Sequence, residues 1–264
     1  MGGVITLITD FGLEDGHVGA MKGVMLGIAP TATLTDITHL VPPQDIRKAA
    51  YALLTAYPHF PHGTIHLVVV DPGVGTERRA VAVRTPSATF VAPDNGVLSY
   101  VLDREPVLKA VSLINQRYWH HPVSPIFHGR DIFGPAAAHL AAGVPLEELG
   151  EVIDPGTLVT FPVSRPRRQP DGSIVAHVQV IDSFGNCTTD LPAEWLSAAP
   201  DWVVEVAGRR IPGVRQTFGQ VAVGEPVALI DSENYLMIAV RNSSAARDLG
   251  LDLGDEVSLY PLKV

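Results

Sequence analysis

The chain has very little cysteine: Cys187 is the only one in 264 residues. A disulfide within the chain and a zinc site built on thiolates are therefore excluded. The lone cysteine fits a reducing cytoplasm. Long apolar runs are also lacking, since none approaches the roughly 20 residues that a membrane-spanning helix needs. Residues 1–11 have no basic segment followed by a cleavable apolar stretch, so we expect no signal peptide and no membrane partner.

Positive charge is scarce as well. The chain carries 19 Lys and Arg residues against 28 Asp and Glu residues, for a formal net charge of -9. Because phosphate contacts need clustered Lys and Arg, no nucleic-acid partner is expected. Charged residues make up only 18% of the chain and hydrophobic residues 46%. This composition excludes a disordered chain and supplies a sizeable core.

Strands and helices alternate over residues 1–161. Continuous β-branched, apolar runs predict buried strands, and apolar residues at helical spacing predict amphipathic helices. The predicted strands are 4–9, 33–37, 64–70, 81–84 and 89–92, and the predicted helices are 15–28, 45–57, 96–102 and 131–142. This alternation predicts an α/β/α domain with a mostly parallel sheet and helices on both faces.

The composition changes near residue 162. Residues 162–172 are rich in proline and arginine and predict an interdomain linker. Beyond the linker only short strands are predicted, at 173–181, 202–206, 226–230, 235–240 and 256–261. Residues 173–264 are therefore predicted to form a second domain, a small antiparallel β-barrel or sandwich.

Two aspartates stand where predicted strands end, at Asp10 and Asp71. In parallel sheets, ligands bind at the carboxyl ends of the strands. The carboxylate of Asp10 could accept hydrogen bonds from a ribose diol. The alternative is an N-cap for the following helix, and the local sequence favours the cap.

The segment that follows Asp71 holds more residues suited to a binding or catalytic site. Gly73 and Gly75 allow the backbone to pass close to a ligand, and Arg78 or Arg79 could return toward Asp71. A phosphate-binding P-loop is excluded because no Gly-Lys-Ser/Thr follows. The plain alternative is a glycine-rich turn with a surface ion pair. Residues 92–96, with Asn-Gly, predict a tight turn that either is only a turn or shapes the site.

His128 directly precedes the alanine-rich helix and could act as a base or hydrogen-bond a water. A lone histidine is more often structural or exposed, and the chain has ten. Asp131 is interpreted as a helix cap that pairs with Arg130. The pair His120–His121 lacks ligand spacing and nearby carboxylates, so no metal site is expected.

A polar turn follows the strand at 173–181. Asp182 could hold an ammonium group, Phe184 could stack on an aromatic base, and Asn186 could pair with a base edge. The local alternative, an Asx turn with a packed phenylalanine, is favoured by the turn itself. Residues 231–235 form a similar polar loop before the next strand.

Five of these segments occur together in an order that resembles one family. They are 9–12 (TDFG), 70–75 (VDPGVG), 92–96 (APDNG), 127–131 (FHGRD) and 184–186 (FGN). The chain resembles the S-adenosyl-L-methionine (SAM) hydrolases, or hydroxide adenosyltransferases, which are related to the fluorinases and chlorinases. The resemblance implies an N-terminal α/β domain, a C-terminal β-barrel, and a homotrimer with the ligand between one subunit's N-domain and a neighbour's C-domain. It implies no cofactor, because SAM is the substrate.

The resemblance also implies roles for particular residues. The family's water-binding set falls on Asp71, Arg78 and His128, with Arg78 preferred over Arg79 because its spacing from Asp71 matches the family. The implied substrate contacts are Asp10 for ribose, Asp182 for the methionine amine, Phe184 and Asn186 for adenine, and Ser232, Tyr235 and Val240 in the other loop and strand.

Halogenases are the near alternative. Fluorinases carry tyrosine where Asp71 stands, serine where Gly129 stands and arginine where Glu233 stands, and they insert a loop before the segment equivalent to Thr89. This chain shares none of these features, so the resemblance predicts a hydrolase that releases adenosine and methionine. A non-catalytic adenosine or SAM sensor would need no Asp71–Arg78–His128 set. A generic dinucleotide-binding protein is disfavoured because no Gly-x-Gly-x-x-Gly follows the first strand.

Overall fold

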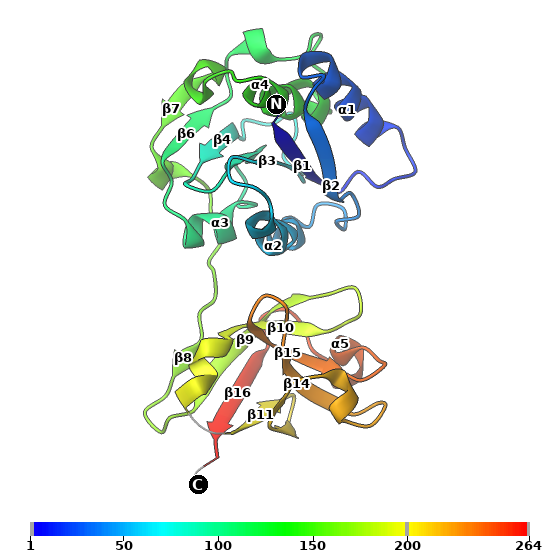
Figure 1. The fold of residues 1–264 in the computed structure, drawn as a ribbon, viewed down its shortest axis with the longest axis vertical. Coiled ribbons are helices and arrows are strands. Elements are labelled where there is room, and N and C mark those ends of the chain that lie inside the picture. Colours follow the sequence, from blue (N-terminus) through cyan, green and yellow to red (C-terminus); the bar gives the residue numbers. More distant parts are fainter. Residues whose placement is uncertain (1–2, 199–200, 263–264) are drawn as a thin grey trace. The chain divides into compact units, whose positions relative to one another are not determined.

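The computed structural model describes residues 3–198 and 201–262. The chain divides into two compact units between Val163 and Ser164 (Figure 1). The first unit has two main hydrophobic cores, and the second unit has its own. Among the described residues, no helix is both long and apolar enough to cross a membrane.

The first unit is built on a seven-stranded sheet with the order β2-β1-β3-β5-β4-β6-β7. Strands β2, β1, β3 and β5 are parallel neighbours, and β4, β6 and β7 extend the sheet in antiparallel fashion. The strands are β1 (Val4–Thr9), β2 (Thr33–Thr38), β3 (Ile65–Val69), β4 (Ala80–Arg84), β5 (Thr89–Pro93), β6 (Lys109–Ser112) and β7 (Glu151–Ile153). The predicted α/β class is confirmed, with its parallel part next to β1 and β3.

Helices cover both faces of this sheet (Figure 1). Helices α1 (His17–Ile28) and α4 (Gly134–Ala141) share one core with Leu67, and α2 (Ile46–Ala56) and α3 (Ser99–Arg104) share the other with Val68. Successive residues of a strand point to opposite faces, so adjacent residues of β3 feed two different cores. Leu67 and Val68 are both fully buried, which explains the continuous apolar run of β3 in the sequence.

The helix predicted over 131–142 instead begins with a π-helical turn, η3 (Gly129–Phe133), and continues as α4. Pro135 has no N–H, so the carbonyl of Asp131 loses its usual helical donor. It accepts the N–H of His120 at 2.8 Å instead. A Cβ on Gly134 would lie 2.9 Å from the Gly129 carbonyl oxygen, so this wide turn needs glycine there.

Short helical turns complete the first unit. They are η1 (Tyr57–His59), η2 (Gln116–Tyr118), η4 (Leu146–Leu149) and η5 (Pro155–Thr157). Helix α2 begins one residue later than predicted because Asp45 is its N-cap, with the Asp45 side chain accepting the N–H of Lys48 at 2.9 Å.

The second unit is a nine-stranded sheet with the order β12-β11-β16-β9-β10-β15-β14-β13, and β8 pairs with β9. Strand β11 also contacts β13, and β12 contacts β14, so the two ends of the sheet meet and nearly close a barrel. Its strands are β8 (Arg167–Arg168), β9 (Ile174–Ile181), β10 (Cys187–Pro192), β11 (Trp202–Val206), β12 (Arg209–Pro212), β13 (Val214–Arg215), β14 (Pro226–Ile230), β15 (Tyr235–Val240) and β16 (Glu256–Pro261). The expected C-terminal barrel is therefore observed.

Buried and half-exposed residues alternate along β9, so every second side chain points into the barrel core. The helical elements of this unit are η6 (Ala193–Ala198), η7 (Phe218–Gln220) and α5 (Ala245–Leu249). Strand β8 lies inside the segment 162–172 that the sequence predicts as linker. Arg167 pairs with Val175 there, so the sheet of the second unit already begins within that segment.

Candidate functional site

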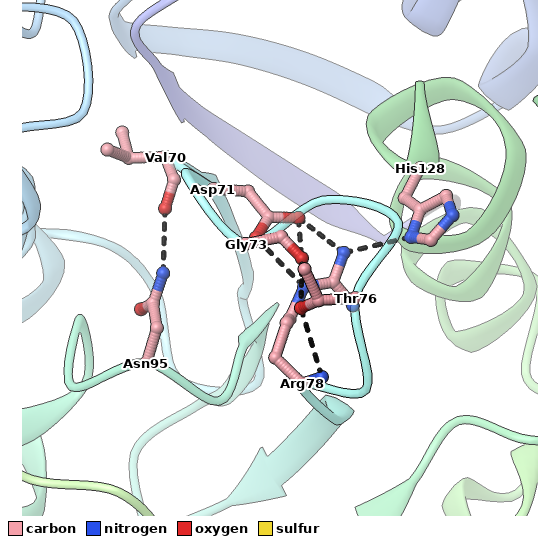
Figure 2. A network of polar contacts seen from close by, with 7 residues as sticks. All are labelled: Val70, Asp71, Gly73, Thr76, Arg78, Asn95 and His128. Carbon is pink, nitrogen blue, oxygen red and sulfur yellow. Dashed lines mark hydrogen bonds and ion pairs between the residues drawn. The ribbon is translucent and has the colours of Figure 1, made fainter. Parts of the chain in front are cut away.

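A loop after β3 turns back on itself and returns Arg78 to Asp71 (Figure 2). The N–H of Val74 bonds the Asp71 carbonyl at 3.2 Å, and the N–H and hydroxyl of Thr76 bond the Gly73 carbonyl at 3.1 and 2.7 Å. A Cβ on Gly73 would stand 3.1 Å from Cγ of Arg78. Glycine therefore leaves the space that the Arg78 side chain crosses.

The guanidinium of Arg78 hydrogen-bonds the Asp71 carboxylate through two of its nitrogens. Nε donates to Oδ1 at 2.8 Å and to Oδ2 at 3.0 Å, and Nη2 donates to Oδ2. The Arg78 and Asp71 side chains are only 11% and 6% exposed. Shielding from water strengthens such a charge-assisted pair. The guanidinium carbon also lies 5.0 Å from the ring centroid of Phe133, a cation–π contact.

His128 joins the same set from the start of the π-helical turn (Figure 2). Its Nδ1 lies 2.9 Å from Nη2 of Arg78. Arginine only donates hydrogen bonds, so Nδ1 accepts and the neutral ring carries its proton on Nε2. Burial and then the Arg78 charge lower the pKa of His128, against the opposing charges of Asp71 and Asp131. The ring is therefore neutral at pH 7.

Arg79 points away from this set. Its Nε donates to Asp94 at 2.8 Å, and its Nη1 donates to the hydroxyl of Thr157 at 3.0 Å. Of the two adjacent arginines, only Arg78 is brought to Asp71 and His128. No local feature of the sequence distinguishes them.

Two further contacts hold the loop in place. Asn95 donates its side-chain N–H to the carbonyl of Val70 at 2.9 Å, directly before Asp71 (Figure 2). Gly75 has φ +78°, and a Cβ there would lie 2.6 Å from the carbonyl oxygen of Pro125. The Asp71 loop thus rests on the loop that leads to His128. The turn at 92–96 is both a turn and a brace for the site.

Asp10 ends β1 at the same edge of the sheet, but it does not cap α1, whose N-cap is Gly16. The capping interpretation is wrong because six residues separate Asp10 from that helix end. Oδ2 of Asp10 instead accepts the N–H of Gln44 at 2.8 Å. Gln44 has φ 67°, which is uncommon for a residue other than glycine. Gln44 could not be recognised from the sequence, because a glutamine carries no signal for that conformation.

In the second unit, Asp182 organises the turn that joins β9 to β10. Its Oδ1 accepts the N–H groups of Phe184 and Asn186 at 2.8 and 2.9 Å, and its Oδ2 accepts the Asn186 side chain at 2.8 Å. The Asx turn is thus confirmed. The packed phenylalanine of that interpretation is wrong, because Phe184 is 77% exposed. An exposed ring and an anchored amide suit a stacking and edge-pairing site.

The other predicted contacts follow β14. Asp231 orders their loop, because its Oδ1 accepts the N–H groups of Glu233 and Tyr235 at 2.9 Å each. Ser232 is exposed and Tyr235 is half-buried. Val240 is only 3% exposed and packs in the barrel core. Its side chain is therefore not open to a ligand, and a substrate contact through the Val240 backbone stays a prediction.

No group of three or more His, Cys, Asp or Glu side chains placed to hold a metal ion occurs within 3–198 and 201–262. His121 instead has its Nε2 2.9 Å from the carbonyl oxygen of Gln116.

The fold and the site define a two-unit protein: an α/β unit that carries a partly buried aspartate–arginine–histidine set beyond a parallel strand, followed by a β-barrel unit. Residues 5–150 match the SAM hydroxide adenosyltransferase N-terminal domain, and residues 176–258 match the corresponding C-terminal domain. The chain belongs to the SAM hydroxide adenosyltransferase family.

Individual relatives agree with this assignment. A protein of Salinispora tropica named (R)-S-adenosyl-L-methionine hydrolase is 43% identical over 258 residues, covering 96% of each chain. A crystal structure of an uncharacterized conserved protein from Thermotoga maritima matches with a TM-score of 0.88 at 37% identity, covering 97% of this chain and 99% of the other. A fluorinase of Actinoplanes sp. is more distant, at 27% identity over 288 residues and 97% of each chain.

Proposed function

We propose that this protein hydrolyses SAM to adenosine and L-methionine by attack of an activated water at the ribose C5′ carbon. The observation that carries the proposal is the single hydrogen-bonded set of Asp71, Arg78 and His128. Family membership and the name of the Salinispora relative support the substrate and the reaction class.

The difficult part of this reaction is the nucleophile. The sulfonium leaves readily, because the C5′–S electron pair goes to sulfur and produces a neutral thioether. Water is a poor nucleophile, with a pKa of about 15.7. Arg78 stabilises the developing hydroxide by its charge, with the two Nη1 donors beyond those used on Asp71 and His128.

The proton of the attacking water needs an acceptor as the O–C5′ bond forms. The only lone pair of the neutral His128 ring, on Nδ1, faces Arg78. Asp71 Oδ1 accepts one N–H from Arg78 and retains a further lone pair. Asp71 is therefore the first proton acceptor, and His128 takes the proton only after its contact with Arg78 opens. Holding water and carbon in line supplies on the order of 7–11 kcal/mol of the acceleration.

The substrate contacts are proposed from the same resemblance. Asp10, with Oδ2 anchored by Gln44, would accept the ribose hydroxyls on its remaining lone pairs. Asp182 would contact the methionine amine, Phe184 and Asn186 the adenine, and Ser232 and Tyr235 the remaining substrate, with Val240 acting through its backbone. No cofactor is required by this mechanism, since substrate, water and protein groups account for every bond made and broken.

Water labelled with ¹⁸O tests the proposal directly. Purified protein is incubated with SAM in labelled water. The products are separated by chromatography, and their masses are measured by mass spectrometry. We expect the label in the 5′-hydroxyl of adenosine and none in methionine. Bound but unreacted SAM would favour the sensor, and unlabelled adenosine would exclude attack of water at C5′.

The variant Arg78→Ala should lower kcat far more than it raises KM, because its charge acts on the attacking water. Arg79→Ala is the matched control, since it removes a neighbouring arginine–aspartate pair that does not touch Asp71 or His128. Equal losses of kcat in both variants would count against water activation by Arg78.

Halide transfer is the alternative reaction, and one contact disfavours it. A Cβ on Gly129 would lie 2.9 Å from Cζ of Phe11 and 3.4 Å from Cγ1 of Val69. The serine that fluorinases carry at this position would therefore fit here only if the Phe11 ring shifted. Added fluoride or chloride should leave adenosine as the only nucleoside product.

We also propose that the protein is a cytoplasmic homotrimer. The lone cysteine, which is buried, suits a reducing compartment, and the family resemblance supports the trimer. Light scattering on the purified protein tests the oligomeric state, and a monomer would exclude a site shared between subunits.

A further inference from the structure

A carboxylate lies buried three residues after His128, and the proposed chemistry does not use it. Asp131 is 0% exposed, whereas the side chain of its ion-pair partner Arg130 is 31% exposed. Taking a carboxylate out of water costs several kcal/mol unless its oxygens are well satisfied. Burial by itself raises the pKa of Asp131, but bonds from Arg130 and Ser124 hold it below its usual value. A permanent charge is thus kept inside the first unit.

The bonds of Asp131 join the two sides of the segment that carries His128. Its Oδ2 accepts the N–H of Ser124 at 2.8 Å, and its backbone carbonyl accepts the N–H of His120 at 2.8 Å. Both partners precede His128, and Asp131 follows it. Arg130 completes the pairing, with Nε 2.6 Å from Oδ1 and Nη2 2.9 Å from Oδ2. The side chain of Asp131 therefore closes the loop of residues 124–131, and its backbone carbonyl ties that loop to His120.

Further hydrogen bonds and packing contacts hold the segment that carries His128. The N–H groups of Arg130 and Asp131 both bond the carbonyl of Phe127 at 3.2 Å. Gly129 packs so closely on Phe11 that a Cβ on it would lie 2.9 Å from Cζ of the Phe11 ring. These contacts restrain the backbone on both sides of His128, whose Nδ1 lies 2.9 Å from Nη2 of Arg78.

We infer that Asp131 is a positioning residue that holds His128 against Arg78. The inference rests on the proposed function, in which the Asp71–Arg78–His128 set activates water. Three charged groups act on His128: Arg78 and Asp71 from the loop after β3, and Asp131 from the π-helical turn. Asp131 raises the pKa of His128, so it acts on the ring through its charge as well as through its bonds. Arg130 and His120 are the charged or titratable groups that act on Asp131 itself.

Two substitutions separate the bonds from the charge. Asp131→Asn keeps an oxygen that can accept the Ser124 N–H but removes the charge, and Asp131→Ala removes both. We expect Asp131→Ala to lower kcat on the order of 10²-fold with KM nearly unchanged, because displacement of a reacting group by about 1 Å has that effect. Asp131→Asn should retain more activity than Asp131→Ala. The acid limb of its kcat–pH profile should lie at lower pH than that of wild type.

The ring of His128 provides a readout that does not depend on turnover. In ¹⁵N-histidine-labelled protein, the signal missing from His128→Gln assigns the ring. Wild type should show an unprotonated Nδ1 and titrate below the usual histidine range. Asp131→Asn should titrate at still lower pH, and Asp131→Ala should lose the fixed tautomer.

Asp190→Asn is the matched control, because Asp190 is also a buried carboxylate, 4% exposed, that accepts a backbone N–H from His177. It should lower stability without moving the His128 signals. Unchanged His128 titration and tautomer in both Asp131 variants would overturn the inference. If the wild type leaves SAM intact, the proposed function fails on its own, whereas the ring spectra still decide whether Asp131 positions His128. If Asp131→Ala does not fold, the titration of Asp131→Asn decides.

Discussion

His66 is a buried histidine that should weaken the first unit as the pH falls from 7 to 4. It stands on β3, is 1% exposed, and has its Nδ1 2.7 Å from the hydroxyl of Thr6. Its ring stacks on Phe90 with centroids 5.3 Å apart. Burial lowers its pKa from 6.5 to about 4, although Glu105 acts in the other direction. Between these two pKa values, His66 is therefore mostly neutral in the folded protein and mostly protonated in the unfolded chain.

The sign and size of this change in the free energy of unfolding follow from proton linkage. The folded-state pKa is the lower one, so the stabilisation is complete above pH 6.5 and is lost as the pH falls toward 4. At pH 5 the loss from this residue is about 2 kcal/mol, and below pH 4 it approaches roughly 3.4 kcal/mol, at 1.36 kcal/mol for each pKa unit. Losses of this size are a large part of the 5–15 kcal/mol that typically holds a domain folded.

Urea unfolding at pH 7 and pH 5, followed by circular dichroism, measures the effect. His66→Asn keeps a polar group near Thr6 but cannot titrate, so its stability should fall by about 2 kcal/mol less than wild type between the two pH values. Leu53→Ala is the control, because Leu53 is fully buried in the same core and its loss costs roughly 2–5 kcal/mol without removing the histidine. Identical pH dependence in wild type and His66→Asn would refute the reasoning.

Two backbone positions near the site give further tests. Gly75→Ala forces a Cβ to within 2.6 Å of the Pro125 carbonyl oxygen at φ +78°, so turnover of SAM and thermal stability should both fall, and the same values as wild type would show that the two loops separate freely. Gln44→Gly keeps the N–H that Asp10 accepts and suits φ 67°, so it should be at least as stable as wild type. Gln44→Val should lose about 1 kcal/mol or more in the same denaturation assay, because a β-branched residue is strained there; equal stability of the two variants would contradict that strain.

The order of the elements was readable in the sequence because it depends on local periodicity. The unbroken apolar run before Asp71 identified a buried strand, and the short strands predicted beyond residue 172 identified a small β domain. The positions of Asp10 and Asp71 at strand ends followed from the strands alone, since parallel strands present their carboxyl ends at one edge. The family resemblance added the set of residues to expect there.

Only the tertiary structure decided which side chains meet. Arg78 and Arg79 are adjacent and chemically identical, yet one reaches Asp71 and the other Asp94, because two turns over residues 71–78 fix the direction in which each side chain leaves the chain. Asp131 was interpreted as a cap and is a buried brace, since the donor that it needed came from Ser124, seven residues away. Local sequence encodes backbone conformation, but the partners of a polar side chain are set by chain segments that only folding brings together.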